Sequence, residues 1–145
     1  MRFLLLVHAG ATLVMLGVIL VMQVVHYPLF ARVGTEEYTA YQKSHMRRIT
    51  GIVLPAMSAE LGTAAWIAFD RPPGVPAWMA WAGLALVALL WASTGLVQTP
   101  LHRRLAEGFD SRTHRRLVHT NGFRTLAWAA RSGLALGMLA RVMEA

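Results

Sequence analysis

Cysteine is absent from this chain of 145 residues, and charged residues are scarce. The missing cysteines exclude both a disulfide framework and thiolate metal ligands. Only 14% of the residues are charged, against roughly 25% in an ordinary soluble domain. Because 56% of the residues are hydrophobic, the composition excludes that class and predicts a protein that lies in a lipid bilayer.

Acidic residues are the rarer of the two charge types. Seven Asp and Glu stand against fourteen Lys and Arg, so the formal net charge is +7. The chain has no recognisable nucleic-acid-binding module that would give this charge such a role, and we expect no nucleic-acid partner. Basic residues that flank membrane helices, close to anionic lipid head groups, are the simpler interpretation.

Long apolar runs take the place of the missing charges. A helix needs about 20 mostly apolar residues to cross the roughly 30 Å of hydrocarbon in a bilayer. The sequence predicts an all-α, polytopic membrane protein, with residues 1–145 forming one membrane domain that is a four-transmembrane-helix bundle. We expect the spans at about 3–28, 46–69, 75–98 and 118–143, and the loops between hairpin partners at 29–45 and 99–117.

Basic residues concentrate in the two segments that follow the first and third spans. The link between the second and third spans, residues 70–74, carries one Arg balanced by one Asp. Short loops rich in Lys and Arg stay on the cytoplasmic side of a membrane. We therefore expect loops 29–45 and 99–117 to be cytoplasmic and both termini to lie on the outer face.

The chain carries one pattern twice. The first apolar run ends in His-Tyr-Pro-Leu-Phe at 26–30, and the third ends in Gln-Thr-Pro-Leu-His at 98–102. We interpret the pattern as two helical-hairpin repeats that run parallel, about an axis along the membrane normal. The copies are not identical, since His26 stands opposite Gln98 and Phe30 opposite His102. Two such hairpins would place their polar ends side by side.

Histidines gather at this shared end and form the candidate site. Neutral imidazoles act as acids and bases, and they bind iron, copper, zinc or haem. The cofactor is not identified by any motif, and haem or a transition metal are the two candidates. Histidines near a membrane interface also cap helices or face lipid head groups, and that alternative stays open. The predicted catalytic residues and metal ligands are His26, His45, His102 and His119, and the predicted substrate-binding residues are Gln23, Tyr27, Gln98, Asn121 and Arg124.

Two charges fall inside predicted spans. Glu60 interrupts the second apolar run, and Arg131 lies at a similar depth in the fourth. A charge at the centre of a bilayer costs roughly 2.5 to 3.5 kcal/mol, so such residues face protein and find partners. We predict a structural ion pair between Glu60 and Arg131, with a proton-relay or substrate role as the alternative.

The four spans and the two repeated segments resemble small, mostly uncharacterised bacterial membrane proteins. They are also loosely similar to the anthrone-oxygenase type of domain of unknown function. The resemblance implies a location in the bacterial inner membrane. Some members of the wider group are implicated in oxidising polycyclic aromatic substrates, which implies a membrane oxidoreductase or oxygenase. No catalytic residue of that group maps onto this chain.

Three functions follow from these expectations. The first is a redox enzyme that acts on a lipophilic substrate at the histidine cluster. The second is a non-catalytic accessory subunit of a larger respiratory or photosynthetic membrane complex. The third is a carrier for a small metabolite, which four spans would form as a homo-oligomer.

Overall fold

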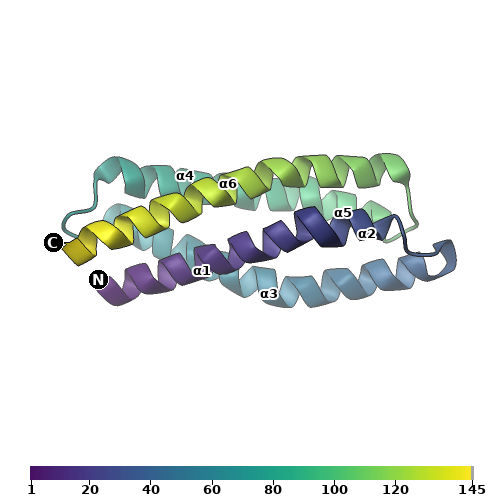
Figure 1. Cartoon of the computed structure of the whole chain (residues 1–145), viewed down its shortest axis with the longest axis horizontal. Helices are drawn as coiled ribbons and strands as arrows, with labels where there is room; N and C mark the ends of the chain where they lie inside the picture. Colours follow the sequence, from purple (N-terminus) through teal and green to yellow (C-terminus); the bar gives the residue numbers. More distant parts are fainter. Residues whose placement is uncertain (145) are drawn as a thin grey trace.

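The computed structural model describes residues 1–144, which form four long helical rods that lie side by side (Figure 1). Strands are absent from this part of the chain. Both termini lie at one end of the bundle, and the turns within each hairpin lie at the other. The rods are α1 (Arg2–Val21), η1 (Met22–His26) and α2 (Tyr27–Phe30); α3 (Thr35–Phe69); α4 (Ala77–Ser93), η2 (Thr94–Gln98) and α5 (Thr99–Leu105); and α6 (Ser111–Glu144).

Three of the four rods are long and apolar enough to cross a membrane. These are the helical segments Arg2–Phe30, Thr35–Phe69 and Ala77–Leu105. The all-helical prediction is thereby confirmed, and a membrane location fits three of the predicted spans. The rod that carries the fourth predicted span, α6, does not meet the same measure of length and composition. Its many arginines lower its hydropathy: Arg112, Arg115, Arg116, Arg124, Arg131 and Arg141.

The core consists of three buried clusters along the bundle. Leu5, Ile67 and Met138 belong to the cluster near the termini. The middle cluster packs Met15, Met57 and Trp128, together with Ile19 and Leu90. The third cluster lies at the end of the bundle that carries the turns within the two hairpins, which we call the turn end. Its aromatic residues Tyr27, Phe30 and Tyr38 pack against Leu101, Leu105 and Leu117. The candidate histidines lie beside this third cluster.

A π-helical turn precedes the proline in both repeated segments. The backbone N–H of Tyr27 donates to the carbonyl of Met22, and that of Thr99 donates to the carbonyl of Thr94. Each bond spans five residues instead of four. Proline lacks an N–H and clashes with the preceding turn, and it is best tolerated where a new helical segment begins. Pro28 and Pro100 occupy that place, so both helices continue beyond them, to Phe30 and to Leu105. The duplication itself stays a prediction.

The turns of both hairpins are shorter than the predicted loops. Residues 31–34 and 106–110 connect the rods, so most of segments 29–45 and 99–117 is helical. Helix α3 starts at Thr35 with Glu36 and Glu37 in its first turn, where acidic side chains suit the helix dipole. Asp110 caps α6, because its Oδ2 accepts from the N–H of Thr113 at 2.7 Å. The early start of α3 brings its first three turns alongside α2 and α5.

Candidate functional site

Three of the four predicted histidines come together at the turn end of the bundle. His26 comes from η1, His45 from α3 and His102 from α5. The Nε2 atom of His26 lies 3.0 Å from Nδ1 of His45. The ring centroids of His45 and His102 are 5.4 Å apart. Residues far apart in the sequence thus form one cluster, which we call the histidine cluster: His26, His45 and His102.

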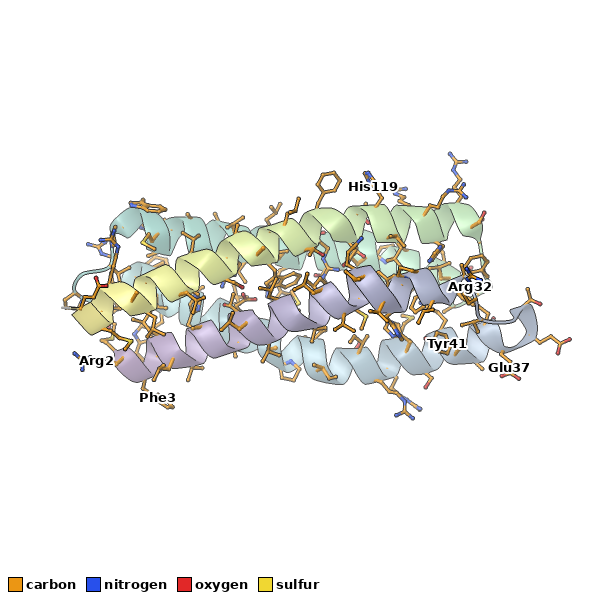
Figure 2. All side chains as sticks on the ribbon, viewed as in Figure 1. Arg2, Phe3, Arg32, Glu37, Tyr41 and His119 are labelled. Carbon is orange, nitrogen blue, oxygen red and sulfur yellow. The ribbon has the colours of Figure 1, made fainter. Side chains whose placement is uncertain are left out.

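His119, the fourth predicted histidine, lies apart from this cluster. Its imidazole is exposed on the outer surface of α6, where it points away from the bundle (Figure 2) and packs edge-on against Phe123. Leu117 and Asn121, two residues before and after His119, are buried in the bundle. Because residues two apart on a helix do not share a face, His119 faces outward. The inward position on α6 belongs instead to His114, whose Nε2 donates to the backbone carbonyl of Tyr27 at 2.7 Å.

Two side chains hold the ring of His102. The amide Nε2 of Gln42 lies 2.8 Å from Nδ1, and the hydroxyl of Tyr27 lies 3.1 Å from Nε2. With the amide nitrogen assigned toward the ring, Gln42 donates and Nδ1 accepts. The ring proton is then on Nε2 and is donated to the Tyr27 oxygen. The Tyr27 hydroxyl proton is left free to bind another acceptor.

Sequence reasoning missed two members of this arrangement. Gln42 binds His102 directly, and the hydroxyl of Tyr41 lies 3.4 Å from Nε2 of His26. A signal for both was present, because Tyr41 and Gln42 precede His45 by four and three residues. Residues at these spacings share a helix face. The contact between Gln42 and His102 could not be predicted from local spacing, because the two residues are 60 positions apart in the sequence.

Burial keeps the two inner histidines neutral at physiological pH. His45 and His102 lie in segments 29–45 and 99–117, outside the predicted spans. Burial lowers the pKa of His45 to about 4, assisted by His26. It lowers the pKa of His102 to about 3, assisted by the neighbouring His45, Arg124 and His26. A neutral imidazole has one donor and one acceptor nitrogen, which suits it to proton exchange.

Three of the five predicted substrate-binding residues, Gln23, Asn121 and Arg124, form a connected polar network beside the cluster. Asn121 donates to Oε1 of Gln23 at 2.8 Å, and its own Oδ1 accepts from Nη1 of Arg124 at 3.0 Å. Nη2 of Arg124 donates to the Thr94 hydroxyl at 3.1 Å. Gln98 binds separately, donating to the Thr120 hydroxyl at 2.9 Å. The network joins the first, third and fourth rods.

A cavity of about 340 Å³ lies between the rods, next to the network. Most of its wall is apolar. Tyr27, His102, Gln98 and Arg124 line it as well, so hydrogen-bonding groups from three rods reach it. Its apolar lining residues are Met15, Val18, Ile19, Met22, Met46, Ile49, Val53, Leu54, Met57 and Trp91.

Glu60 and Arg131 form an ion pair away from the cavity. The Nε atom of Arg131 lies 2.6 Å from Oε1 of Glu60, and both side chains are buried. The indole of Trp128 donates to the other carboxylate oxygen, and Nη1 of Arg131 donates to the carbonyl of Gly83. The pair therefore connects α3, α4 and α6. Neither residue lines the cavity.

Three-ligand geometry for a metal ion is absent from residues 1–144, and the prediction of haem, which needs only one or two axial ligands, stays a prediction. No group of three or more His, Asp or Glu side chains there is arranged to hold a metal ion. The physical reason is visible in the cluster, where nitrogens of His26 and His45 bind each other instead of facing a shared point. A bound cofactor therefore stays a prediction.

No protein-family model matches the chain, and no curated protein or solved structure shows significant similarity to it. The resemblance to bacterial membrane proteins of the anthrone-oxygenase type stays a prediction.

Proposed function

We propose that the chain is a four-span integral membrane enzyme of the bacterial inner membrane that acts on a lipophilic substrate. The substrate body lies in the 340 Å³ cavity, and its reacting oxygen faces His102 and Tyr27. Loops 29–45 and 99–117 are cytoplasmic, so the histidine cluster lies at the cytoplasmic end. The observation that carries the proposal is that hydrogen-bonding groups from three rods line one predominantly apolar cavity.

The apolar outward face of α6 supports the proposal of a fourth span, although arginines lower the hydropathy of this helix. From residue 123 to residue 140 every exposed side chain on α6 is apolar or absent, and Arg124 and Arg131 point inward. At 1.5 Å per residue this stretch is roughly 27 Å long, close to the hydrocarbon thickness of a bilayer. The exposed positions in this stretch are Phe123, Leu126, Ala129, Ala130, Gly133, Leu136 and Ala140.

The cavity wall suits the body of an apolar molecule. Methionine, isoleucine, valine and leucine side chains make up most of it, with the ring of Trp91. A volume of about 340 Å³ is near the lower end of the usual range for small-molecule sites, roughly 300 to 1,000 Å³. One aromatic ring system or one short chain fits that space.

The chemistry at the polar part is proton handling. His102 donates to the Tyr27 oxygen, and the free Tyr27 proton can pass to a substrate oxygen as negative charge develops there. General acid catalysis of this kind contributes roughly 10² to 10⁴ in rate. Polycyclic phenols and ketones have such an oxygen. Their oxidation consumes dioxygen as the electron acceptor: anthrone and one dioxygen give anthraquinone and one water.

Anthrone oxidation under air tests the enzyme proposal. Membranes that contain the chain should form anthraquinone, measured by absorbance, faster than matched membranes without it. Tyr27→Phe and His102→Gln should each lower the rate at least tenfold, while Leu136→Phe, on the exposed face of α6, should leave it unchanged. A wild-type rate equal to that of the empty membranes would overturn the enzyme proposal.

Ligand binding is tested separately from turnover. Val53 lines the cavity, so Val53→Phe should fill part of it and weaken the binding of anthracenemethanol at least tenfold in a fluorescence titration. Leu136→Phe adds the same ring to the outer surface and serves as the matched control. Equal affinities for the two variants would show that the cavity is not the binding site.

A further inference from the structure

Two arginines of α6 are buried in the bundle, and only one of them has a counter-charge. Arg131 pairs with Glu60 at 2.6 Å. Arg124, seven residues earlier, forms no ion pair with any carboxylate among residues 1–144, although only 6% of its surface is exposed. A buried charge in a membrane protein normally has a partner, because desolvation of an isolated ion is costly.

Neutral groups satisfy part of the Arg124 guanidinium. Nη1 donates to Asn121 and Nη2 donates to Thr94. The ring of Trp128 lies 5.2 Å from the guanidinium carbon, close enough for a cation–π contact. The Nε atom is buried and has no hydrogen-bond partner among the described residues. The Nε donor of Arg124 and its positive charge therefore have no partner of opposite character among residues 1–144.

The unmatched charge borders the cavity. Arg124 lines it, and no Asp or Glu is among the lining residues. Tyr27 lines the same cavity, and its hydroxyl proton is free because His102 already donates to its oxygen. Both groups are donors, and one is a cation. An acceptor with a negative charge complements them better than a neutral head group.

We infer that the natural ligand of the cavity is a lipophilic anion, with a carboxylate or enolate oxygen bound by Arg124 and Tyr27 and an apolar body against the methionine-rich wall. This rests on the proposed function for the location of the ligand, and it adds the charge of its head group. Arg124 is then the residue that selects anions over neutral molecules of the same shape.

Anthracenecarboxylate and anthracenemethanol share a ring system and differ in the charge of the head group. Fluorescence titrations of the full chain in nanodiscs of uncharged phospholipid should show that the carboxylate binds at least tenfold more tightly at pH 7.5, as expected for a hydrogen bond to a charged group. Equal affinities would overturn the inference while leaving the cavity proposal intact. Failure of both molecules to bind would count against the proposed function as well.

Two variants identify the residue responsible. Arg124→Met has an uncharged side chain of similar length and should remove the preference for the carboxylate over the alcohol. Arg124→Lys keeps the charge and should retain most of the preference. If Arg124→Met binds the carboxylate as tightly as the wild type does, the inference is wrong. The comparison of the two molecules on the wild-type chain needs no variant and decides the question even if Arg124→Met does not fold.

Phospholipid is the competing source of an anionic head group. Addition of phosphatidylglycerol to the nanodiscs should displace anthracenecarboxylate weakly, because a two-chain lipid exceeds a cavity of about 340 Å³. Complete displacement at a few lipids per protein would show that Arg124 binds the membrane lipid, and it would overturn the assignment of a small-molecule anion.

Discussion

The Nε atom of Arg131 lies 2.6 Å from Oε1 of Glu60, where the side chains of α3 and α6 meet inside the bundle. Trp128 donates to the same carboxylate, and the carbonyl of Gly83 accepts from the same guanidinium. Because three helices contribute to one buried pair, its main effect is on how the two hairpins pack. The structural role of the pair stays a prediction.

Removal of one partner of this pair should destabilise the chain more than removal of both. Glu60→Gln leaves a buried, uncompensated guanidinium, for which a loss of about 3 to 5 kcal/mol is typical. The double variant with Glu60→Gln and Arg131→Met has no buried charge left to compensate and should recover most of that loss. Denaturant unfolding in detergent micelles measures the stabilities of the wild type, Glu60→Gln, Arg131→Met and the double variant. If the losses in the single variants add up in the double variant, the two side chains are not coupled.

The stability of the chain should decrease as the pH falls below 6.5. Burial lowers the pKa of His45 to about 4 and that of His102 to about 3, from 6.5 in the unfolded chain. Between these values the unfolded state binds more protons than the folded state, so stability is highest above pH 6.5 and is lost as the pH falls toward 4. Thermal unfolding in detergent at pH 7.5 and pH 5 measures the decrease.

The double variant with His45→Gln and His102→Gln should show a smaller decrease over the same pH range. His119→Gln is the matched control, because it replaces an exposed imidazole outside the histidine cluster. A decrease of the same size in the double variant and the wild type would mean that other groups control the pH dependence.

The cap of α6 should contribute to stability through its ionised form. Hydrogen bonds from Thr113 lower the pKa of Asp110, so the contribution is present above the unfolded pKa near 4 and is lost as the pH falls further. Asp110→Ala should lower Tm, while Asp110→Asn should keep most of the cap, because asparagine is also a good capping residue. Circular dichroism during thermal unfolding compares the three chains. An unchanged Tm in Asp110→Ala would show that the first turn of α6 does not need the cap.

Two glycines of α6 should respond differently to alanine. A Cβ atom at Gly133 would meet no atom within 4 Å, whereas one at Gly137 would lie 3.0 Å from the terminal methyl of Met79. Gly133→Ala should therefore stabilise the helix by roughly 0.5 to 1 kcal/mol. Gly137→Ala should gain less, because Met79 must move. The spacing of these glycines is also that of a helix-dimer motif. A loss of stability in Gly133→Ala, with a shift toward monomer in size-exclusion chromatography, would indicate that a second copy covers this face.

Local patterns in the sequence were sufficient for the helices and for much of the candidate site. Apolar runs of about 20 residues predict the rods. A charge at a similar depth in two of these runs predicts that Glu60 and Arg131 face each other. The cap of α6 is equally local, because the carboxylate of Asp110 accepts from the N–H of Thr113, three residues later. These features depend on residues close together in the chain, or on the cost of burying a charge. Both can be evaluated without knowing how the helices pack.

Contacts between distant segments needed the tertiary structure. The choice between His114 and His119 depends on the rotation of α6 about its axis, which is set by the packing of buried residues such as Leu117, Asn121 and Trp128. The pairing of Gln42 with His102 joins residues 60 positions apart. Neither contact follows from local spacing. Each residue along a helix is rotated by about 100° from the one before, so a small rotation of the helix changes which side chain faces the bundle.

The sequence by itself determined the all-helical fold class, the four helical rods and the end of the bundle at which most of its histidines gather, because these follow from hydropathy and local spacing. The tertiary structure alone decided that His26, His45 and His102 meet while His119 faces outward. It also decided that Arg131 has a carboxylate beside it, and that Arg124 has none among the described residues and borders a cavity. Side-chain packing sets the rotation and register of each rod, and those two quantities determine which polar groups come within hydrogen-bonding distance.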